Sequence, residues 1–423
     1  MNSNRLVVWI AAVFLIVTST SFLVMSDSSS GPIKLTAPAS LVPRDFFGLH
    51  IHRAFGTTPW PPVPFGSWRL WDAKVHWPQV EIKKNEWQWD ILDREVELAE
   101  KHHIDVLLPF GETPEWAASG GRFRTAIVGD IADLEDWRTF IRTQATRYKG
   151  RIVYYEIWNE PNLPRNRDIG TPERMLTLAR EAYTTLKQVD PNIKVISPSP
   201  VNANGLDWLE RYLKLGGGKY CDIIGYHFYT YHRPETMLQL ILPAKELMRK
   251  YGVDDKPLWN TESGWIKNPL TDRIDLVEQA PGWAARAYIL NWAAGVQRFY
   301  WYAWDDDGHD SIPFTQEDQA TATSSAYAYG QVQDWMVGSR MESCERQADD
   351  NWVCKLTRGS GNAAWILWNE RHSAKFDVPN SWGVTNLTKL SGEKSAWTGN
   401  TIDINELPVF LEAQTVRHSR SIP

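Results

Sequence analysis

Residues 153–160 read VYYEIWNE and residues 257–262 read PLWNTE, and each stretch begins with apolar residues and ends at a glutamate. Both have the length and the aromatic or β-branched content of a buried strand. Six further runs of this kind lie at 46–52, 67–72, 105–111, 194–198, 223–229 and 299–304. Helix-forming stretches separate them, for example at 89–102, 134–148, 172–189 and 282–294. Eight strand-helix units predict an α/β fold in which a parallel sheet closes into a (β/α)8 TIM barrel.

The pattern changes near residue 340. Short alternating strands follow, such as 363–368 and 407–411, and Gly, Asn and Pro separate them. Alternation with frequent turns is typical of antiparallel sheets. We therefore predict a barrel domain at 46–339 and a small antiparallel β-sandwich domain at 340–423, with 31–45 as a linker or a further strand of the β domain.

The N-terminal 30 residues have the pattern of an export signal. Arg5 precedes a largely apolar stretch at 6–25, of which 6–17 is uninterrupted. The uninterrupted part has the length of a signal-peptide core, and the whole stretch has the length of a membrane span. Both a removed signal and a retained membrane tether fit, and either predicts a periplasmic or extracellular body.

Composition narrows the class of partner. The chain has 45 Lys+Arg against 51 Asp+Glu, a formal charge of −6, and no long basic run, so we predict no nucleic-acid partner. It has 23 tryptophans in 423 residues. Sugar rings stack their C–H faces on indoles, so this excess favours a carbohydrate ligand, although large aromatics also fill a large core.

Only three cysteines are present, which excludes a disulfide scaffold and a cysteine-based metal site. Cys344 and Cys354 lie at equal distances from Asp349, in a turn-like segment. If the segment is a hairpin, the two cysteines are cross-strand neighbours and an oxidising compartment allows a disulfide; two free thiols are the alternative. Cys221 is expected to be an inert buried thiol.

Glu160 and Glu262 end the fourth and seventh predicted strands. In a (β/α)8 barrel the C-terminal ends of the strands form the rim where active sites lie. Cleavage of a glycosidic bond needs a carboxylic acid to protonate the leaving oxygen and a carboxylate on the opposite side. We expect the charge of Glu262 to raise the pKa of Glu160, and the two carboxyl groups to lie roughly 5–5.5 Å apart, the spacing of retaining enzymes.

The motifs around these glutamates resemble a known superfamily. Trp158–Pro161 (WNEP) on strand four and Thr261–Glu262 (TE) on strand seven resemble glycoside hydrolase clan A, whose members are retaining enzymes, over roughly residues 46–335. Arg69–Asp72 (RLWD), Thr113–Trp116 (TPEW) and the trailing β domain are similar to family 39. That family includes β-xylosidases, α-iduronidases and enzymes that cleave bacterial exopolysaccharides.

The resemblance assigns roles to single residues. It implies that Glu160 is the acid/base, that Glu262 is the nucleophile and that Asn159 holds the substrate 2-hydroxyl. His227 and Tyr229 match positions that touch the nucleophile or the sugar, and which of them contacts Glu262 stays open. Arg69 matches an arginine that orients the nucleophile; a structural ion pair with Asp72 or Glu156 is the alternative.

Aromatic side chains near the strand ends complete the predicted site. The candidates for sugar stacking, with core packing as the alternative, are Trp116, Trp265, Trp301 and Trp304, and the weaker candidates for substrate contact are His50 and His52. Asp305–Asp307 and Asp310 lack the spacing of an EF-hand and are expected to form a solvated or substrate-contacting loop. We predict no metal and no cofactor.

The sequence therefore predicts an exported retaining β-glycoside hydrolase whose partner is a polysaccharide or oligosaccharide, and which cuts exopolysaccharide within the chain. An exo-acting glycosidase of the β-xylosidase kind is the first alternative. A non-catalytic carbohydrate-binding barrel is the second, although a decayed site commonly loses one carboxylate. Transglycosylation uses the same residues.

Overall fold

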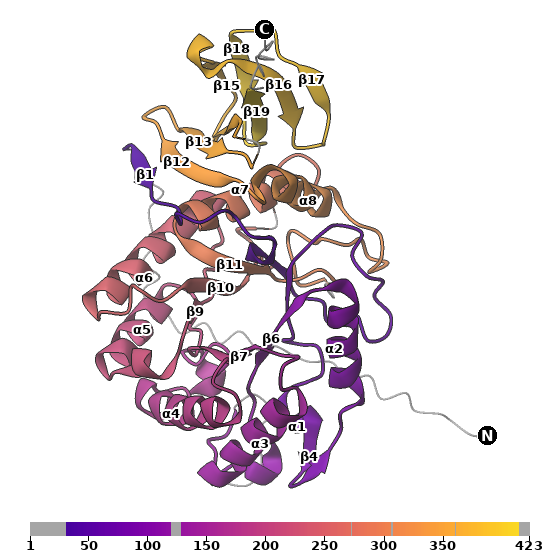
Figure 1. Cartoon of the computed structure of the whole chain (residues 1–423), viewed down its shortest axis with the longest axis vertical. Coiled ribbons are helices and arrows are strands. Elements are labelled where there is room, and N and C mark those ends of the chain that lie inside the picture. The colour runs from indigo at the N-terminus through magenta and orange to yellow at the C-terminus, as the bar shows by residue number, and fades with distance from the viewer. Residues whose placement is uncertain (1–30, 120–127, 272, 306–307, 360, 414–423) are drawn as a thin grey trace, which may run out of the picture. The chain divides into compact units, whose positions relative to one another are not determined.

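A computed structural model describes residues 31–119, 128–271, 273–305, 308–359 and 361–413 (Figure 1). The predicted export signal at 1–30 lies outside the described residues, as do Asp306 and Asp307 of the acidic loop. Within the described ranges, no helix has both the length and the apolar character that a membrane span requires.

Eight parallel strands form the barrel, and each lies within one of the predicted runs or overlaps it. Their order in the sheet is β8-β7-β6-β3-β2-β11-β10-β9, and a parallel bridge between Ile196 and Ile223 joins the two ends. The closed (β/α)8 fold is thus confirmed. The bounds are β2 Phe47–Leu49, β3 Ser67–Arg69, β6 Asp105–Pro109, β7 Tyr154–Glu156, β8 Lys194–Ile196, β9 Ile224–Tyr226, β10 Leu258–Ser263 and β11 Val296–Trp301.

Helices cover the outside of the barrel (Figure 1). Three of them begin at side-chain caps: Asp133 accepts from the amide of Glu135, Thr171 from that of Arg174, and Thr323 from that of Ala326. The α-helices are α1 Trp77–Val80, α2 Asp90–His102, α3 Leu134–Arg147, α4 Pro172–Val189, α5 Asn204–Lys214, α6 Leu238–Lys250, α7 Ala280–Ala293 and α8 Ser324–Met336. Short 3-10 helices lie at η1 Arg44–Phe46, η2 Glu115–Ala117, η3 Pro164–Asn166, η4 Gly217–Tyr220, η5 Pro234–Met237 and η6 Asn380–Trp382.

The C-terminal region is antiparallel, as predicted. A seven-stranded sheet has the order β1-β12-β13-β14-β19-β16-β17, so the N-terminal strand β1 joins it beside β12. A two-stranded sheet of β15 and β18 shares a second hydrophobic core with it. The bounds are β1 Ile33–Leu35, β12 Arg340–Arg346, β13 Asn351–Thr357, β14 Ala363–Asn369, β15 Ala374–Asp377, β16 Val384–Lys389, β17 Lys394–Ala396, β18 Thr401–Ile404 and β19 Val409–Ala413. A hairpin of β4 Glu81–Lys83 and β5 Glu86–Trp87 follows α1.

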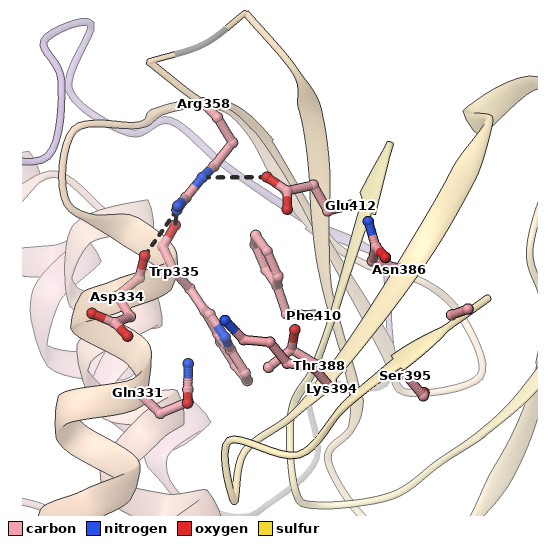
Figure 2. A pocket seen from close by; sticks show the side chains of 11 residues that line it. Gln331, Asp334, Trp335, Arg358, Asn386, Thr388, Lys394, Ser395, Phe410 and Glu412 are labelled. Carbon is pink, nitrogen blue, oxygen red and sulfur yellow. Dashed lines mark hydrogen bonds and ion pairs between the residues drawn. The ribbon is translucent and has the colours of Figure 1, made fainter. Parts of the chain in front are cut away.

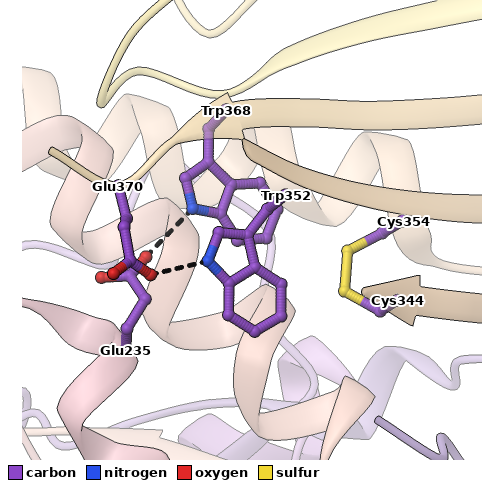
Figure 3. The surroundings of a disulfide bond; sticks show 6 residues. All are labelled: Glu235, Cys344, Trp352, Cys354, Trp368 and Glu370. Carbon is purple, nitrogen blue, oxygen red and sulfur yellow. Dashed lines mark hydrogen bonds between the residues drawn. A yellow bond between two sulfur atoms is a disulfide. The ribbon is translucent and has the colours of Figure 1, made fainter. Parts of the chain in front are cut away.

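Cys344 and Cys354 are directly opposite each other on the β12–β13 hairpin and form a disulfide, with their Cα atoms 3.9 Å apart (Figure 3). Beside it, the indoles of Trp352 and Trp368 stack with ring centroids 5.3 Å apart. Trp368 donates through Nε1 to Glu235 of η5, at 3.0 Å. This bond links the β domain to the segment of the barrel that follows β9.

The barrel interior has an apolar and cationic lower layer and a polar upper layer. In the lower layer Arg298 lies over the rings of Tyr154 and Trp259, 4.4 and 4.3 Å from their centroids, and pairs with Asp45 and Asp105. The upper layer lies at the C-terminal ends of the strands, where the side chains are carboxylates, hydroxyls, an imidazole and a guanidinium. That layer is the candidate site.

Candidate active site

Glu160 and Glu262 meet in the upper layer of the barrel. Glu262 belongs to β10, whereas Glu160 lies four residues beyond the end of β7 and has a left-handed backbone, with φ of 47°. One oxygen of each carboxylate and Nδ1 of His227 lie within 4.8 Å of one another. The sequence placed Glu160 at the end of a strand; the strand ends at Glu156, and the chain then turns to bring Glu160 toward Glu262.

Arg69 holds this arrangement together from β3. Its guanidinium donates to Glu156 at 2.6 Å, to Glu262 at 2.7 Å and to Oδ1 of Asn159 at 2.8 Å. The arginine is fully buried, so these three acceptors replace the water that it loses. Arg69 was predicted either to orient the nucleophile or to form a structural ion pair. It does both, because it binds Glu262 and also pairs with Glu156.

Glu156 lies behind the site, and both of its carboxylate oxygens accept hydrogen bonds. Its Oε1 accepts hydrogen bonds from the hydroxyls of Thr261, at 2.8 Å, and of Ser199. Its other oxygen is bound to Arg69, and the side chain is completely buried. The carboxylate thus has partners on both oxygens, which lets a buried charge persist and fixes the position of Arg69.

His227 lies closest to Glu160, whereas Tyr229 contacts Glu262. Tyr229 donates through its hydroxyl to Oε1 of Glu262, at 3.0 Å. Nδ1 of His227 is 3.1 Å from Oε1 of Glu160 and 3.8 Å from Oε1 of Glu262. Burial lowers the pKa of His227 to about 4, against the opposing effect of Glu262, so the imidazole is neutral at neutral pH.

Burial is the main cause that raises the pKa of both glutamates. For Glu160 the raising is opposed by Arg165 and Arg69, and for Glu262 by His227 and Arg69. We expected the charge of Glu262 to raise the pKa of Glu160. That pKa is raised, mainly because the carboxyl has lost water, and the repulsion between the two carboxylates raises the pKa of Glu262.

Two residues beside Glu160 were not among the predicted site residues. Nη2 of Arg165, on η3, is 3.5 Å from Oε2 of Glu160, and the arginine side chain is 39% exposed. Tyr231 follows Tyr229 on the segment after β9 and is 39% exposed. Burial, and after it the Glu160 carboxylate, raise the pKa of Tyr231. Arg165 lies on a short 3-10 helix and Tyr231 on a loop, and strand periodicity gives no signal for either.

Three of the four tryptophans predicted to stack on sugar are core residues instead. Trp265, Trp301 and Trp304 are completely buried. Trp301 stacks on Phe314 with centroids 4.6 Å apart, and Trp265 packs against Trp301 at 5.6 Å. A ring with no exposed face cannot receive a sugar, so packing explains these three residues, and the stacking prediction for them is wrong.

Trp116 is half-buried at the edge of the site region. Its indole N–H donates to the carbonyl of Glu81 at 3.1 Å, and its ring meets Trp77 edge-on at 5.9 Å. These contacts leave part of the ring exposed, so sugar stacking on Trp116 stays a prediction.

Tyr302, which sequence reasoning missed, is the aromatic ring that faces the site at the end of β11. Its ring lies 5.1 Å from that of His50 and 5.0 Å from that of His52, and its hydroxyl donates to Asp72 at 2.7 Å. His50 is completely buried, and its Nε2 is 3.2 Å from the carbonyl oxygen of Thr261. His50 therefore supports the wall of the site, while His52 is exposed in part beside Tyr302.

The two described residues of the acidic loop, Asp305 and Asp310, bind backbone amides. Asp305 is buried, and its carboxylate accepts from the backbone amides of His52 at 2.6 Å and Arg53 at 2.9 Å. Asp310 accepts from the amide of Ala303 at 2.8 Å. The two carboxylates thus anchor the backbone that follows two neighbouring strands, β2 and β11.

The cluster of Glu160, His227 and Glu262 has the spacing of a three-ligand metal site. Its electrostatics are unfavourable for one, since Arg69 already contacts Glu262 at 2.7 Å and a cation between the carboxylates would lie close to the guanidinium. The donor set fits a pair of carboxylates that exchange a proton better than a cation site.

Residues 131–329 match the family model described as glycosyl hydrolase catalytic core. A curated relative, the β-xylosidase of Geobacillus stearothermophilus, is 23% identical in an alignment that covers 45% of this chain and 44% of the xylosidase, so the match spans less than half of that relative.

Solved structures extend the likeness to the fold. A family 39 glycoside hydrolase from Bacteroides cellulosilyticus WH2 has a TM-score of 0.71 at 19% identity, over 88% of this chain and 81% of the other. A family 39 β-xylosidase from Caulobacter crescentus has a TM-score of 0.62 at 16% identity, over 90% and 99%. The matched family model confirms the resemblance of this chain to a glycosyl hydrolase catalytic core, and the solved structures show that it shares the fold of family 39 enzymes.

Proposed function

We propose that the protein is an exported retaining β-glycoside hydrolase that works by double displacement, with Glu262 as nucleophile and Glu160 as acid/base. The observation that carries the proposal is the approach of the two carboxylates, with oxygens within 4.8 Å. Retaining enzymes hold their carboxyl groups about 5–5.5 Å apart, whereas inverting enzymes leave about 6.5–9.5 Å for a water molecule. The short separation supports direct attack by a carboxylate.

The contacts of the two glutamates support this division of roles. Two carboxyl groups this close do not both ionise readily. The one with the nearer cations and hydrogen-bond donors carries the negative charge. Glu262 receives Arg69 at 2.7 Å and the Tyr229 hydroxyl at 3.0 Å, whereas Glu160 has the cation Arg165 at 3.5 Å and the neutral imidazole of His227 at 3.1 Å. The proton therefore stays on Glu160, and Glu262 is the anion.

The carboxyl groups of Glu262 and Glu160 can then perform both displacements of the reaction. Glu262 attacks the anomeric carbon while Glu160 gives its proton to the leaving oxygen, which forms a glycosyl ester and breaks the glycosidic bond. The ester removes the charge of Glu262, so Glu160 can take a proton from water, which hydrolyses the ester. Asn159 supports this assignment: its Oδ1 is bound to Arg69, and its buried Nδ2 has no acceptor among the residues that the structure describes, so it is available to a substrate hydroxyl.

A polysaccharide cut within its chain is the substrate that we favour. A leaving sugar must lie against Glu160, and the side chains there, Arg165 and Tyr231, are exposed. An arginine and a phenol offer hydrogen bonds and a ring face to such a sugar. Exopolysaccharide outside the cell fits the predicted export signal. An exo-acting β-xylosidase is the second candidate, because the curated relative and the Caulobacter structure carry that name.

A substrate panel separates these candidates. Purified protein would be given xylan, bacterial exopolysaccharides and a series of aryl β-glycosides, and the products followed by chromatography. Chain-internal cleavage should give a ladder of oligosaccharides from the start of the reaction. Release of single sugars alone would favour the exo-acting alternative, and binding without cleavage would favour the non-catalytic barrel.

Replacing Glu160 by alanine should give a variant that azide rescues. With an aryl glycoside that the wild type accepts, the leaving group needs little protonation, so the glycosyl ester forms and waits for a base. Azide attacks the ester without a base and should restore turnover, giving the β-glycosyl azide. In the Glu262→Ala protein azide should instead give the α-product, as identified by NMR. The opposite pair of products would reverse the two roles.

Replacing Arg165 by glutamine should extend activity to higher pH. Glu160 protonates the leaving group only in its neutral form, so activity is lost as the pH rises through its pKa. Arg165 lowers that pKa, and removing the cation should raise it. We expect the alkaline limb of the kcat/KM profile to move up by roughly 0.5–1 pH unit, a modest change because the guanidinium is partly solvated. Arg165→Lys should keep the wild-type limb; an unchanged limb in Arg165→Gln would rule out this role.

A further inference from the structure

A groove of about 670 Å³ lies between α8 and the β domain (Figure 2). Its walls come from α8, from the loop after β13 and from strands β16, β17 and β19. Among the residues that line it are Gln331 and Asp334 of α8, Arg358 of the loop after β13, Asn386 and Thr388 of β16, and Lys394 of β17. None of them takes part in the site at the barrel mouth.

One end of the groove is rigid. The ring of Trp335 stacks on Phe410 of β19, with centroids 5.4 Å apart and an interplanar angle of 9°. Arg358 donates to the last carbonyls of α8, at 2.9 Å to that of Asp334 and also to that of Trp335, and it pairs with Glu412 at 3.6 Å. The helix end and the sheet are thus fixed relative to each other, and the groove between them is preformed.

The face of the sheet changes character along this groove. Toward the barrel the same face carries buried aromatic residues such as Trp368 and Phe410, and beyond α8 it carries Thr388, Asn386 and Lys394. Thr388, which lines the groove, is only 7% exposed. The hydroxyl, amide and ammonium groups of these three side chains offer hydrogen-bond donors and acceptors to a ligand in the groove.

The charges of the lining point to the class of ligand. Asp334 and Glu412 are negative, Arg358 and Lys394 are positive, and amides and hydroxyls separate them. Neither an anion nor a cation is favoured by such a balanced set. A sugar hydroxyl both donates and accepts, so it can use a carboxylate, an ammonium group, an amide or a hydroxyl as partner.

We propose that this groove is a second carbohydrate-binding site, which holds a neutral stretch of a polysaccharide chain while another part of a chain lies in the active site. The proposal rests on the proposed function for the identity of the polymer. Binding at two places raises the apparent affinity for long chains by avidity and leaves short glycosides unaffected. The groove thereby favours polymers over the small glycosides that the active site alone can hold.

The test compares a groove variant with a matched control. The groove variant carries Asn386→Ala, Thr388→Val and Lys394→Ala; the control carries Lys375→Ala, which removes an exposed lysine of β15 in the same domain. Both are made in the Glu262→Ala protein, which should not degrade the probes. Binding is measured by affinity electrophoresis in gels that contain xylan or one of the exopolysaccharides of the substrate panel.

The groove variant should bind the polymer at least about tenfold more weakly than the control, the size expected when one of two linked contacts is lost. In the background with Glu262 intact, the same changes should leave kcat/KM on an aryl glycoside within about twofold. Because the ligand is neutral, retention by the parent protein should persist at high salt.

Equal retention of the groove variant and the control would overturn the proposal, as would a lack of retention by every polymer or retention that disappears in salt. Lys394→Ala alone, which changes only an exposed side chain, provides the same comparison if the triple variant unfolds. These outcomes would overturn only the second binding site. The proposed function would fail on a different result, if the Glu262→Ala protein kept its activity on aryl glycosides.

Discussion

Replacing Glu262 by alanine should lower kcat on any accepted β-glycoside by about 10⁴-fold or more, the scale seen when a covalent nucleophile is removed. Glu156, the buried carboxylate behind the site, cannot take its place, because it is bound to Arg69, Thr261 and Ser199. Folding should survive, because Arg69 keeps Glu156 and Asn159 as acceptors. Initial rates and thermal unfolding would be measured on the same preparation.

Glu97→Ala is the matched control, since Glu97 is an exposed glutamate of α2. It should keep wild-type rates, because a surface substitution far from the site changes neither charge nor geometry there. A Glu262→Ala protein that folds and retains more than about a tenth of the wild-type rate would exclude Glu262 as the nucleophile, since that loss corresponds to only about 1.4 kcal/mol.

Replacing Arg69 by methionine should destabilise the protein by about 3–5 kcal/mol, the cost of leaving a buried ion without its partner. The change strands Glu156, which is fully buried, and also removes the cation at 2.7 Å from Glu262. Activity should fall with it, because Glu262 is then neutralised more readily. Urea unfolding monitored by tryptophan fluorescence would give the free energy of unfolding.

Two further variants test whether the unpaired charge of Glu156 causes the loss of stability. Adding Glu156→Gln to Arg69→Met should restore part of the lost stability, because it removes the stranded charge. Arg211→Met, which breaks an exposed pair with Glu173, should cost less than about 1 kcal/mol. If Arg69→Met proved as mild as Arg211→Met, the buried network would not hold the site together.

The barrel was predictable because its strands are buried on both faces and appear as apolar runs. The same property explains the error with the tryptophans. Successive side chains of a strand face opposite sides, but when both sides are apolar the sequence does not say which residues face the barrel axis. Tyr300 belongs to the interior cluster and Tyr302 faces the site, whereas Trp301 between them packs on Phe314 outside.

The position of Glu160 and its loop partners depended on tertiary structure. The local sequence identifies the WNEP motif, but the left-handed turn at Glu160 and the contacts of Arg165 and Tyr231 arise from loops that meet only in the folded chain. Part of the buried network could be predicted from the sequence. Arg69, Glu156 and Glu262 lie at or next to the ends of three barrel strands, and their charges are complementary. The groove beside α8 gave no sequence signal, because its residues come from five separate segments.

The stereochemistry of hydrolysis tests the central claim most directly. Proton NMR would follow the anomeric signals during cleavage of a β-glycoside that the panel identifies, before the released sugar mutarotates. Double displacement through Glu262 inverts the anomeric carbon twice, so the β-anomer should appear first and the α-anomer later. Appearance of the α-anomer first would mean a single displacement by water, and would contradict the assignment of Glu262 as nucleophile.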